Sequence, residues 1–217
     1  MLSPKIEHNL NQIKEQIIGK KVFIFDLETT GLFDKKLFYK YWDNTVFDPA
    51  RIVEIGYYYS ENFGLDFESN NIIHSYLRKP TDFDSIHPKA EETHGLSIDK
   101  LKTHGYTFSR ILNQDLIAKL NSCEIIISHN TLFDFSILLN ELHRFKLKST
   151  IQYLQSIKSN NLLLCTCRAS GYKKLSFLYK SIFNSDPDIL HRAGDDVITL
   201  ISIIIKEKIN FNLKSIL

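Results

Sequence analysis

Cysteine is scarce in this sequence, and long apolar segments are missing. Its 217 residues include three cysteines, Cys123, Cys165 and Cys167, an odd and sparse set that argues against a disulfide framework and favours a reducing compartment. No apolar stretch approaches the roughly 18 residues of a membrane-spanning helix, and residues 1–10 are too polar for a signal peptide. We therefore expect a soluble, intracellular protein without membrane contact, cytoplasmic or, in a eukaryote, nuclear.

An excess of charge of one sign is also missing. The chain has 27 Lys and Arg against 25 Asp and Glu, a net charge of +2. This balance neither requires nor excludes nucleic acid, because a local basic patch can bind it on a nearly neutral protein. Internal repeats, low-complexity tracts and linkers are absent as well. Since 43% of the residues are apolar, the chain can build a full core, and its length suggests one domain.

The most informative stretch is VFIFDLETTG, residues 22–31. Its first four residues are β-branched or aromatic, which predicts a buried strand that continues into Asp26 and Glu28. Side chains two apart on a strand share a face, so both carboxylates project to one place and repel each other unless a cation or proton lies between them. Such oxygen ligands suit Mg²⁺ or Mn²⁺. The alternative is a pair of surface charges before a plain turn.

Hydrophobic spacing predicts the remaining elements. Three strands come first and are followed by alternating helices and strands, which indicates an α/β fold with a five-stranded mixed sheet flanked by helices. We interpret residues 92–97 as a turn before a short helix that starts at residues 97–101, and the CTC sequence of residues 165–167 as part of a strand. The expected helices are 5–18, 108–120, 133–145, 174–183 and 192–208, and the expected further strands are 51–59, 72–77, 124–128 and one within 158–169.

Two segments allow two interpretations each. The apolar stripe of the first helix, Ile6, Leu10, Ile13 and Ile17, either packs on the flank of the domain or binds a partner. Residues 32–50 interleave aromatic side chains with lysines, which is the composition of a platform for single-stranded nucleic acid. A small hydrophobic cluster under a long loop is the alternative. This segment contains Phe33, Lys35, Lys36, Phe38, Tyr39, Lys40, Tyr41, Trp42 and Phe47.

Two later stretches contain further acidic residues. Asp134 lies in the first turn of a helix that leaves the carboxyl end of a strand, where open α/β sheets bind ligands. An acidic residue there also stabilises a helix by itself. His191 and Asp196 lie five residues apart at the start of the last helix, within reach of one site.

Together these stretches resemble the motifs of the DEDDh 3′-to-5′ exonucleases, the DnaQ-like family of the proofreading epsilon subunit of bacterial DNA polymerase III. The resemblance covers about residues 21–208 and keeps the order of the motifs. Residues 25–31 resemble the first motif, His129, Asn130, Phe133 and Asp134 the second, and His191, Ala193 and Asp196 the third; residues 51–56 and 94–96 match in addition. It implies a ribonuclease H-like fold, with an exonuclease domain at residues 21–217, an aromatic and basic insertion at about 33–50, and an N-terminal amphipathic helix at 1–20.

The resemblance also implies a chemistry. Asp26, Glu28, Asp134 and Asp196 would hold two divalent cations, Mg²⁺ or Mn²⁺, about 4 Å apart. His191 would be the general base that takes a proton from the attacking water. Two departures matter: the insertion is longer than in the family, and Asp195 offers a second carboxylate, although the spacing from His191 selects Asp196. The substrate contacts implied are Leu27, Thr29, Thr30, Leu32, His129, Asn130 and Phe133.

The expected reaction is release of nucleoside 5′-monophosphates from the 3′ end of single-stranded DNA, in proofreading or repair. RNA trimming or degradation of oligoribonucleotides is the runner-up. An inactive nucleic-acid-binding module and a small-molecule phosphodiesterase are further alternatives. A polymerase subunit is a possible partner, with the helix of residues 5–18 as its docking element.

Overall fold

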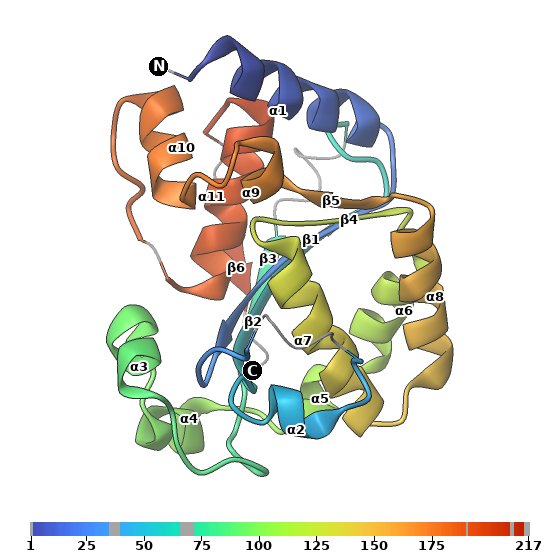
Figure 1. Ribbon diagram of the computed structural model, residues 1–217, viewed down its shortest axis with the longest axis vertical. Coiled ribbons are helices and arrows are strands. Elements are labelled where there is room, and N and C mark those ends of the chain that lie inside the picture. The colour runs from blue at the N-terminus through green and yellow to red at the C-terminus, as the bar shows by residue number, and fades with distance from the viewer. Residues whose placement is uncertain (1, 35–39, 66–71, 190, 209–210, 215–217) are drawn as a thin grey trace.

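The fold is built on a mixed sheet whose strands are ordered β5-β4-β1-β2-β3-β6 (Figure 1). The computed structural model describes residues 2–34, 40–65, 72–189, 191–208 and 211–214. The strands are β1 Val22–Thr29, β2 Ile52–Ser60, β3 Ile72–Leu77, β4 Ile125–Ser128, β5 Leu163–Cys165 and β6 Asn212–Lys214. The helices are α1 Pro4–Ile17, α2 Asn44–Phe47, α3 Pro88–His94, α4 Ile98–His104, α5 Phe108–Ile111, α6 Gln114–Ser122, α7 Thr131–Arg144, α8 Lys148–Ser159, α9 Thr166–Ala169, α10 Leu175–Phe183 and α11 Ala193–Ile205.

The central strand is β1, which pairs antiparallel with β2 and parallel with β4. The outer pairs are antiparallel for β2 with β3 and parallel for β4 with β5. The predicted combination of antiparallel and parallel parts is therefore confirmed. The prediction of five strands is wrong by one, because β6 adds to β3 in parallel. This strand has only three residues, all exposed, so it lacks the apolar alternation by which a sequence reveals a strand.

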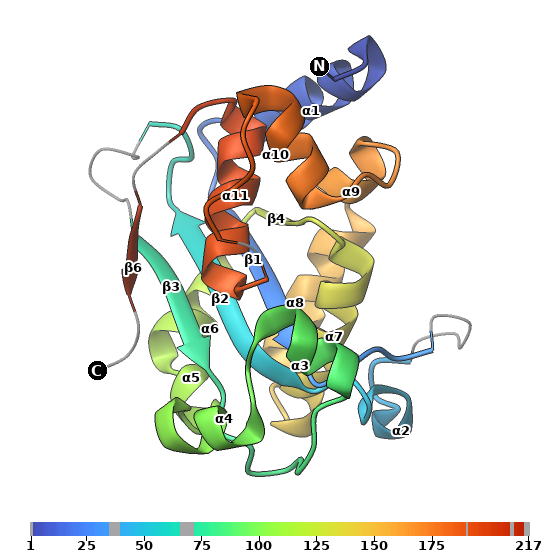
Figure 2. The same ribbon diagram turned by 90° about the vertical axis from the view of Figure 1, so that its left-hand side faces the viewer.

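Alternate residues of β1 serve two cores. Phe23, Phe25 and Leu27 pack with apolar residues of α6, α7 and α8, whereas Val22 and Ile24 pack with α11 and α1. The views in Figures 1 and 2 show α11 on one face of the sheet and α7 and α8 on the other. Because side chains alternate between the two faces of the sheet, each residue of β1 faces the same helix layer as the residue two positions before it. Asp26 and Glu28 continue the series that faces α11.

Helix α1 packs on the domain through its apolar stripe. Leu10 and Ile17 are fully buried and Ile13 is nearly so, and their neighbours lie on α10 and α11. Of the two interpretations of this stripe, packing on the flank is the one that the structure shows. The division into residues 1–20 and 21–217 stays a prediction. Among the described helices, none is long and apolar enough to cross a membrane.

Several local predictions are corrected. The helix expected at 108–120 is two helices, because the Asn113 side chain accepts a hydrogen bond from the Leu116 backbone N–H at 2.8 Å and so caps a new helix, α6. Helix α8 lies where the sequence analysis predicts no element. The predicted strand in 158–169 shrinks to β5, and Cys167 lies in α9 instead. All three cysteines are free thiols, as expected.

The described residues include part of the insertion. Phe33 and Phe47 are buried with ring centroids 4.9 Å apart, and Phe33 stacks on Phe133 at 5.2 Å. These residues form the hydrophobic cluster that was the alternative to a platform, while Trp42 stays half exposed. Lys35, Lys36, Phe38 and Tyr39 lie outside the described residues, so the prediction of a platform is not tested there.

Candidate active site

The first two candidate ligands lie on β1, where it runs past β2. Asp26 pairs with Gly56 and Glu28 pairs with Glu54 in the antiparallel register, and the register shifts directly after Glu28. Both carboxylates are partly exposed although their neighbours on either side are buried. The predicted placement of two acidic side chains on one face of a strand end is therefore observed.

The start of α11 packs directly on β2 because Gly56 has no side chain. A Cβ atom at Gly56 would lie 2.2 Å from the carbonyl carbon of Ala193 and 2.4 Å from the backbone nitrogen of Gly194. Only glycine permits two backbones to approach so closely. This contact sets the first turn of α11, and with it Asp196, over the acidic end of β1.

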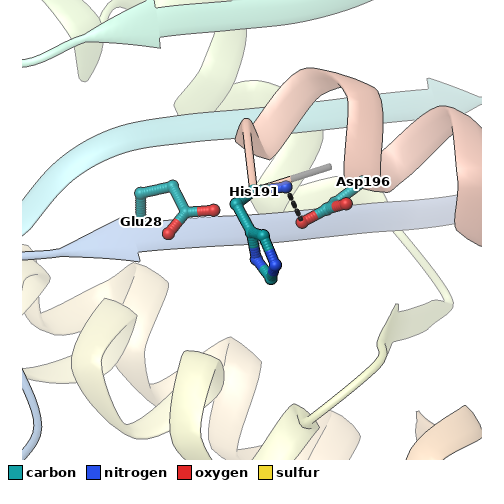
Figure 3. A group of neighbouring side chains, drawn as sticks. All are labelled: Glu28, His191 and Asp196. Atoms are coloured by element: carbon teal, nitrogen blue, oxygen red, sulfur yellow. Dashed lines mark hydrogen bonds between the residues drawn. The ribbon is translucent and has the colours of Figure 1, made fainter. Parts of the chain in front are cut away.

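Glu28, His191 and Asp196 form one group. Each offers a ligand atom, and these atoms all lie within 4.8 Å of one another. Figure 3 shows Glu28 projecting from β1 toward the chain before α11, where the His191 side chain and the Asp196 carboxylate lie. Residues more than 160 positions apart in the sequence, from the first and the third motif, thus meet at one point.

The backbone of His191 holds Asp196 in place. His191 has a φ of 61°, in the left-handed region, where histidine is more common than most side chains. In this conformation its backbone N–H donates to Oδ2 of Asp196 at 3.2 Å. The other oxygen, Oδ1, is buried without a hydrogen-bond partner among the described residues. A buried acceptor without a donor is costly, and a cation in this position would satisfy it.

Asp134 joins the site from α7. It lies in the first turn of the helix, is almost fully buried, and accepts a hydrogen bond from Ser128 Oγ of β4 at 3.0 Å. Two turns later Glu141 accepts from Arg51 Nε at 2.7 Å and from an Arg78 guanidinium nitrogen at 2.6 Å. These buried ion pairs bind α7 to the sheet, so the position of Asp134 is fixed from both ends of the helix.

The electrostatics of the carboxylates show that they act on one another. Burial, together with the charges of Asp134, Asp196 and Glu28, raises the pKa of Asp26 well above its usual value. Burial and the charges of Asp196, Glu54 and Asp134 raise the pKa of Glu28 to about 8, and burial raises the pKa of Asp196 to about 7. Without a counter-ion such a cluster keeps protons near neutral pH. Divalent cations would replace them, so the donor set and the orphaned Asp196 oxygen both fit metal binding.

Glu54, to which the sequence pattern assigns no role, lies on β2 opposite Glu28 and beneath the site. It is fully buried and accepts hydrogen bonds from Ser75 Oγ, from two nitrogens of Arg192 and from the Ala193 backbone N–H. A buried acidic residue in an apolar strand is the signal that points to such a role, because a lone carboxylate is rarely buried unless it is paired.

A pocket of about 380 Å³ opens beside Glu28. It joins the end of β1 to α3 and to the first turn of α7. Four predicted substrate contacts line it together: Leu27, Thr29, Leu32 and Phe133. The other lining residues include His87, Lys89, Ala90, Thr93 and His94, which the sequence analysis did not identify.

The α3 residues of this pocket were not predicted because the sequence analysis assigns part of this helix to a turn. Residues 92–94, which we interpret from the sequence as part of a turn, belong to α3. Pro88 in its first turn and Gly95 just after its end, with a φ of 67°, are the boundary signals that identify the helix. His94 donates from Nε2 to the Thr29 carbonyl oxygen at 3.2 Å and so ties α3 to the end of β1.

The remaining predicted residues lie outside this pocket. The Thr30 hydroxyl accepts from the Arg51 N–H at 2.8 Å and donates to the Pro49 carbonyl, so it is used within the chain. His129 bonds through its two ring nitrogens to Thr166 Oγ1 and to the Lys173 carbonyl, and burial lowers its pKa. Asn130 is exposed before α7. Asp195 is half-buried and takes no part in the group that includes Asp196.

Comparison with known proteins identifies the family of this chain. Residues 23–204 match the model of the family RNase_T, described as exonuclease. Among solved structures, S. pombe Pop2p in its Mg²⁺- and Mn²⁺-bound form is 18% identical, with a TM-score of 0.56 over 95% of this chain and 90% of that one. E. coli exonuclease I in complex with single-stranded DNA and zinc is 14% identical, with a TM-score of 0.54 over 85% of this chain.

These similarities differ in what they establish. The chain spans 39% of the exonuclease I chain, and no curated protein matches the sequence. At such identities the structural likeness shows the fold alone, and it confirms the predicted ribonuclease H-like class. The acidic site with its histidine supports the predicted need for divalent cations, while the DnaQ-like subgroup stays a prediction. Because the family model covers most of its length, the chain belongs to the RNase_T family of exonucleases and is a DEDD-type 3′-to-5′ exonuclease.

Proposed function

We propose that this enzyme removes nucleotides from the 3′ end of single-stranded DNA and releases nucleoside 5′-monophosphates. The observation that carries the proposal is the meeting of Glu28, His191 and Asp196 within 4.8 Å, next to a pocket that opens at the end of the same strand. Acidic ligands, a histidine and a nucleotide-sized pocket are the parts that hydrolysis of a terminal phosphodiester needs.

The four carboxylates would hold the cations. Asp26 and Glu28 come from β1, Asp134 from α7 and Asp196 from α11. Two divalent cations at such a site supply Lewis-acid stabilisation of the charge that develops on the phosphate oxygens. The raised pKa values of Glu28 and Asp196 support this role, since a cation favours the ionised form of both groups.

His191 would act as the general base. Its side chain is exposed at the rim of the carboxylate group, where it can reach a water molecule that attacks the phosphorus. An imidazole can both take up and release a proton, as a general base must. The hydrogen bond from its backbone to Asp196 keeps base and metal ligand in one unit.

The pocket beside Glu28 would hold the 3′-terminal nucleoside. Leu27, Leu32 and Phe133 give it apolar walls for a base or sugar, and Lys89 adds a cation. Its volume of about 380 Å³ lies within the range of small-molecule sites, about 300–1,000 Å³. DNA is favoured over RNA by the resemblance of the motifs, and RNA trimming remains the runner-up.

A role in proofreading for a separate polymerase belongs to the same proposal. The predicted docking element, α1, buries its apolar stripe against α10 and α11, so a partner would have to contact another face of this helix.

The experiment combines substrate and mechanism. The protein is incubated with Mg²⁺ or Mn²⁺ and 5′-labelled single strands of DNA or RNA, beside the variant Asp134→Asn. The matched control is Asp99→Asn, the same change at an exposed position of α4. We expect a ladder that shortens from the 3′ end of DNA, absent for Asp134→Asn and unchanged for Asp99→Asn. Cleavage of RNA alone would reassign the substrate, and equal activity of Asp134→Asn would remove Asp134 from the site.

A further inference from the structure

The nearly neutral chain carries a strong charge asymmetry between Leu142 and Ser185. This segment contains eight Lys and Arg residues and no Asp or Glu, which leaves 19 cationic against 25 acidic side chains in the rest of the chain. Blocks of like charge mark surfaces that bind an oppositely charged partner. Three of the eight cations, Arg168, Lys173 and Lys174, lie in α9 and in the loop between α9 and α10.

We name five exposed residues here the α9–α10 surface: Arg168, Tyr172, Lys173, Lys174 and Phe177. None of the three cations is ion-paired within the described part of the chain, whereas Lys180 on α10 pairs with Asp186 at 2.9 Å. The surface therefore presents unneutralised positive charge. A polyanion gains from such a site, because it releases counter-ions when its phosphates are neutralised.

Two aromatic rings lie among these cations. Tyr172 is 78% exposed and Phe177 is 49% exposed, and the Lys173 ammonium lies 5.3 Å from the centre of the Phe177 ring. Tyr172 has a φ of 65°, a conformation that a bulky side chain adopts at some cost in energy. Its backbone N–H donates to the Cys167 carbonyl at 2.7 Å, which holds the residue in this position.

The α9–α10 surface is attached to the catalytic edge of the sheet. His129, the first residue after β4, bonds through Nε2 to the Lys173 carbonyl at 2.9 Å, and its own carbonyl accepts from the Cys167 N–H at 2.9 Å. Asp134 follows five residues later. In Figures 1 and 2, α9 lies above the start of α7. Helix α3, which lines the nucleotide pocket, lies below the start of α7. The helices α9 and α3 thus lie on different sides of the start of α7, the helix that carries Asp134.

We propose that the α9–α10 surface binds the single strand on the 5′ side of the terminal nucleotide. Arg168, Lys173 and Lys174 contact its phosphates, and a base stacks on Tyr172 or Phe177. Rings that stack on bases beside cations that meet phosphates are the usual composition of sites for single strands. This inference rests on the proposed function, because the pocket must take the 3′ end for the strand to continue toward α9.

The test measures binding and cleavage separately. Binding of a fluorescent 12-nucleotide single strand is followed by anisotropy in EDTA, and hydrolysis of the 12-mer and of a dinucleotide is followed with Mn²⁺. The variants are Lys173→Ala with Lys174→Ala, Tyr172→Ala and Tyr172→Phe. The matched control is Lys100→Ala with Lys102→Ala, which removes the same charge from exposed positions of α4.

We expect the α9–α10 double variant to bind the 12-mer at least tenfold more weakly and to lower the salt dependence of binding by about 1.4, since each single-strand phosphate contributes about 0.7. Tyr172→Ala should weaken binding by about 5- to 150-fold and Tyr172→Phe should restore it, because stacking needs only the ring. Hydrolysis of the dinucleotide should not change in any of these variants.

The outcomes separate the two proposals. If the double variant and its α4 control bind the 12-mer alike, the α9–α10 surface is not the track, whatever the enzyme cleaves. If binding falls as expected but the unaltered protein cleaves neither substrate, the surface stands and the proposed function fails. Tighter binding to phosphatidylserine vesicles than to the 12-mer, lost in the double variant, would assign the surface to membranes and overturn this inference.

Discussion

Glu54, which is buried, and Arg192, which is partly exposed, form a bidentate ion pair between the second strand and the residue that follows His191. The two contacts measure 3.0 Å from Nε to Oε2 and 2.9 Å from a terminal guanidinium nitrogen to Oε1. Glu54 also accepts from the Ala193 N–H at 3.1 Å, so one carboxylate holds the backbone on the C-terminal side of His191. The left-handed conformation of His191 and its hydrogen bond to Asp196 depend on this anchor.

Glu54→Gln is expected to lower turnover at least tenfold while changing the Michaelis constant little. The amide keeps the shape of the side chain but cannot accept from Arg192 and Ala193 with a full charge, so His191 and Asp196 lose their common alignment. Steady-state kinetics on a single-stranded oligonucleotide measure the effect. The control is Glu7→Gln, which breaks the Glu7–Lys206 pair at the far end of α11. Equal turnover of both variants would reduce the Glu54–Arg192 pair to a purely structural contact.

Asp26→Asn is expected to abolish activity and at the same time to stabilise the metal-free protein at pH 8. The substitution removes a charge that repels those of Glu28, Asp134 and Asp196, and relief of this repulsion raises the melting temperature. Thermal melts in EDTA and the nuclease assay test both parts. A lower melting temperature for Asp26→Asn than for Asp99→Asn would show that the carboxylates do not repel one another.

The stability of the metal-free protein should fall as the pH rises from about 4.5 to about 8. The pKa of Glu28 rises from 4.5 to about 8 and that of Asp196 from 3.8 to about 7 on folding. Between these values the folded state holds protons that the unfolded state has lost, so each rise in pH favours unfolding. Melting temperatures in EDTA across this range measure the slope, and a rise in stability with pH would contradict the shifts.

Divalent cations should reverse this loss. Because Mn²⁺ binds the ionised carboxylates of the folded state only, a concentration one hundred times its dissociation constant adds about 2.7 kcal/mol, or roughly 5–10 °C. The gain should grow as the pH rises and should disappear in Asp196→Asn, whose site lacks one ligand. Melting temperatures of the metal-free protein, measured with and without added Mn²⁺ at pH 6 and pH 8, provide the comparison. A gain that is the same at both pH values would place the ion elsewhere.

The sequence reveals those site residues whose role is evident from the pattern of their neighbours in the chain. Asp26 and Glu28 follow an apolar run in a strand, and Asp134 lies in the first turn of a helix. The alternation of side chains along the strand and the position of Asp134 in its helix therefore place all three carboxylates at the same edge of the sheet. Glu54 could not be assigned in this way, because its partner Arg192 lies 138 residues further along the chain. Only the antiparallel register, which sets Glu54 opposite Glu28, shows that its carboxylate lies beneath the site.

The fold shows the same limit. The strand β1 and the helix α11 have long apolar patterns and are found at nearly the predicted residues. Helix α8 buries an equally regular series against the core, but the polar residues between its members mask the pattern in the sequence. The series is Thr150, Ile151, Leu154 and Ile157. The exposed strand β6 has no such pattern, and its place beside β3 follows from tertiary contacts alone.

Gly56→Ala is expected to remove activity through the backbone, without touching a catalytic group. The added Cβ would meet backbone atoms of Ala193 and Gly194 at 2.2–2.4 Å, so the start of α11 must move away from β2 and carry Asp196 with it. Overpacking of this kind costs about 1–3 kcal/mol, and the displaced ligand should weaken the stabilisation by Mn²⁺ as well as turnover.

A variant of similar stability separates misplacement from general destabilisation. Leu10→Ala opens a cavity under α1, remote from the acidic group, and should cost about 2–5 kcal/mol. At 20 °C, where both variants are folded, we expect Leu10→Ala to keep its turnover and its shift in melting temperature with Mn²⁺, whereas Gly56→Ala loses both. If the two variants retain the same activity, the close approach of α11 to β2 does not position Asp196, and the alignment of the site must come from the Glu54 anchor alone.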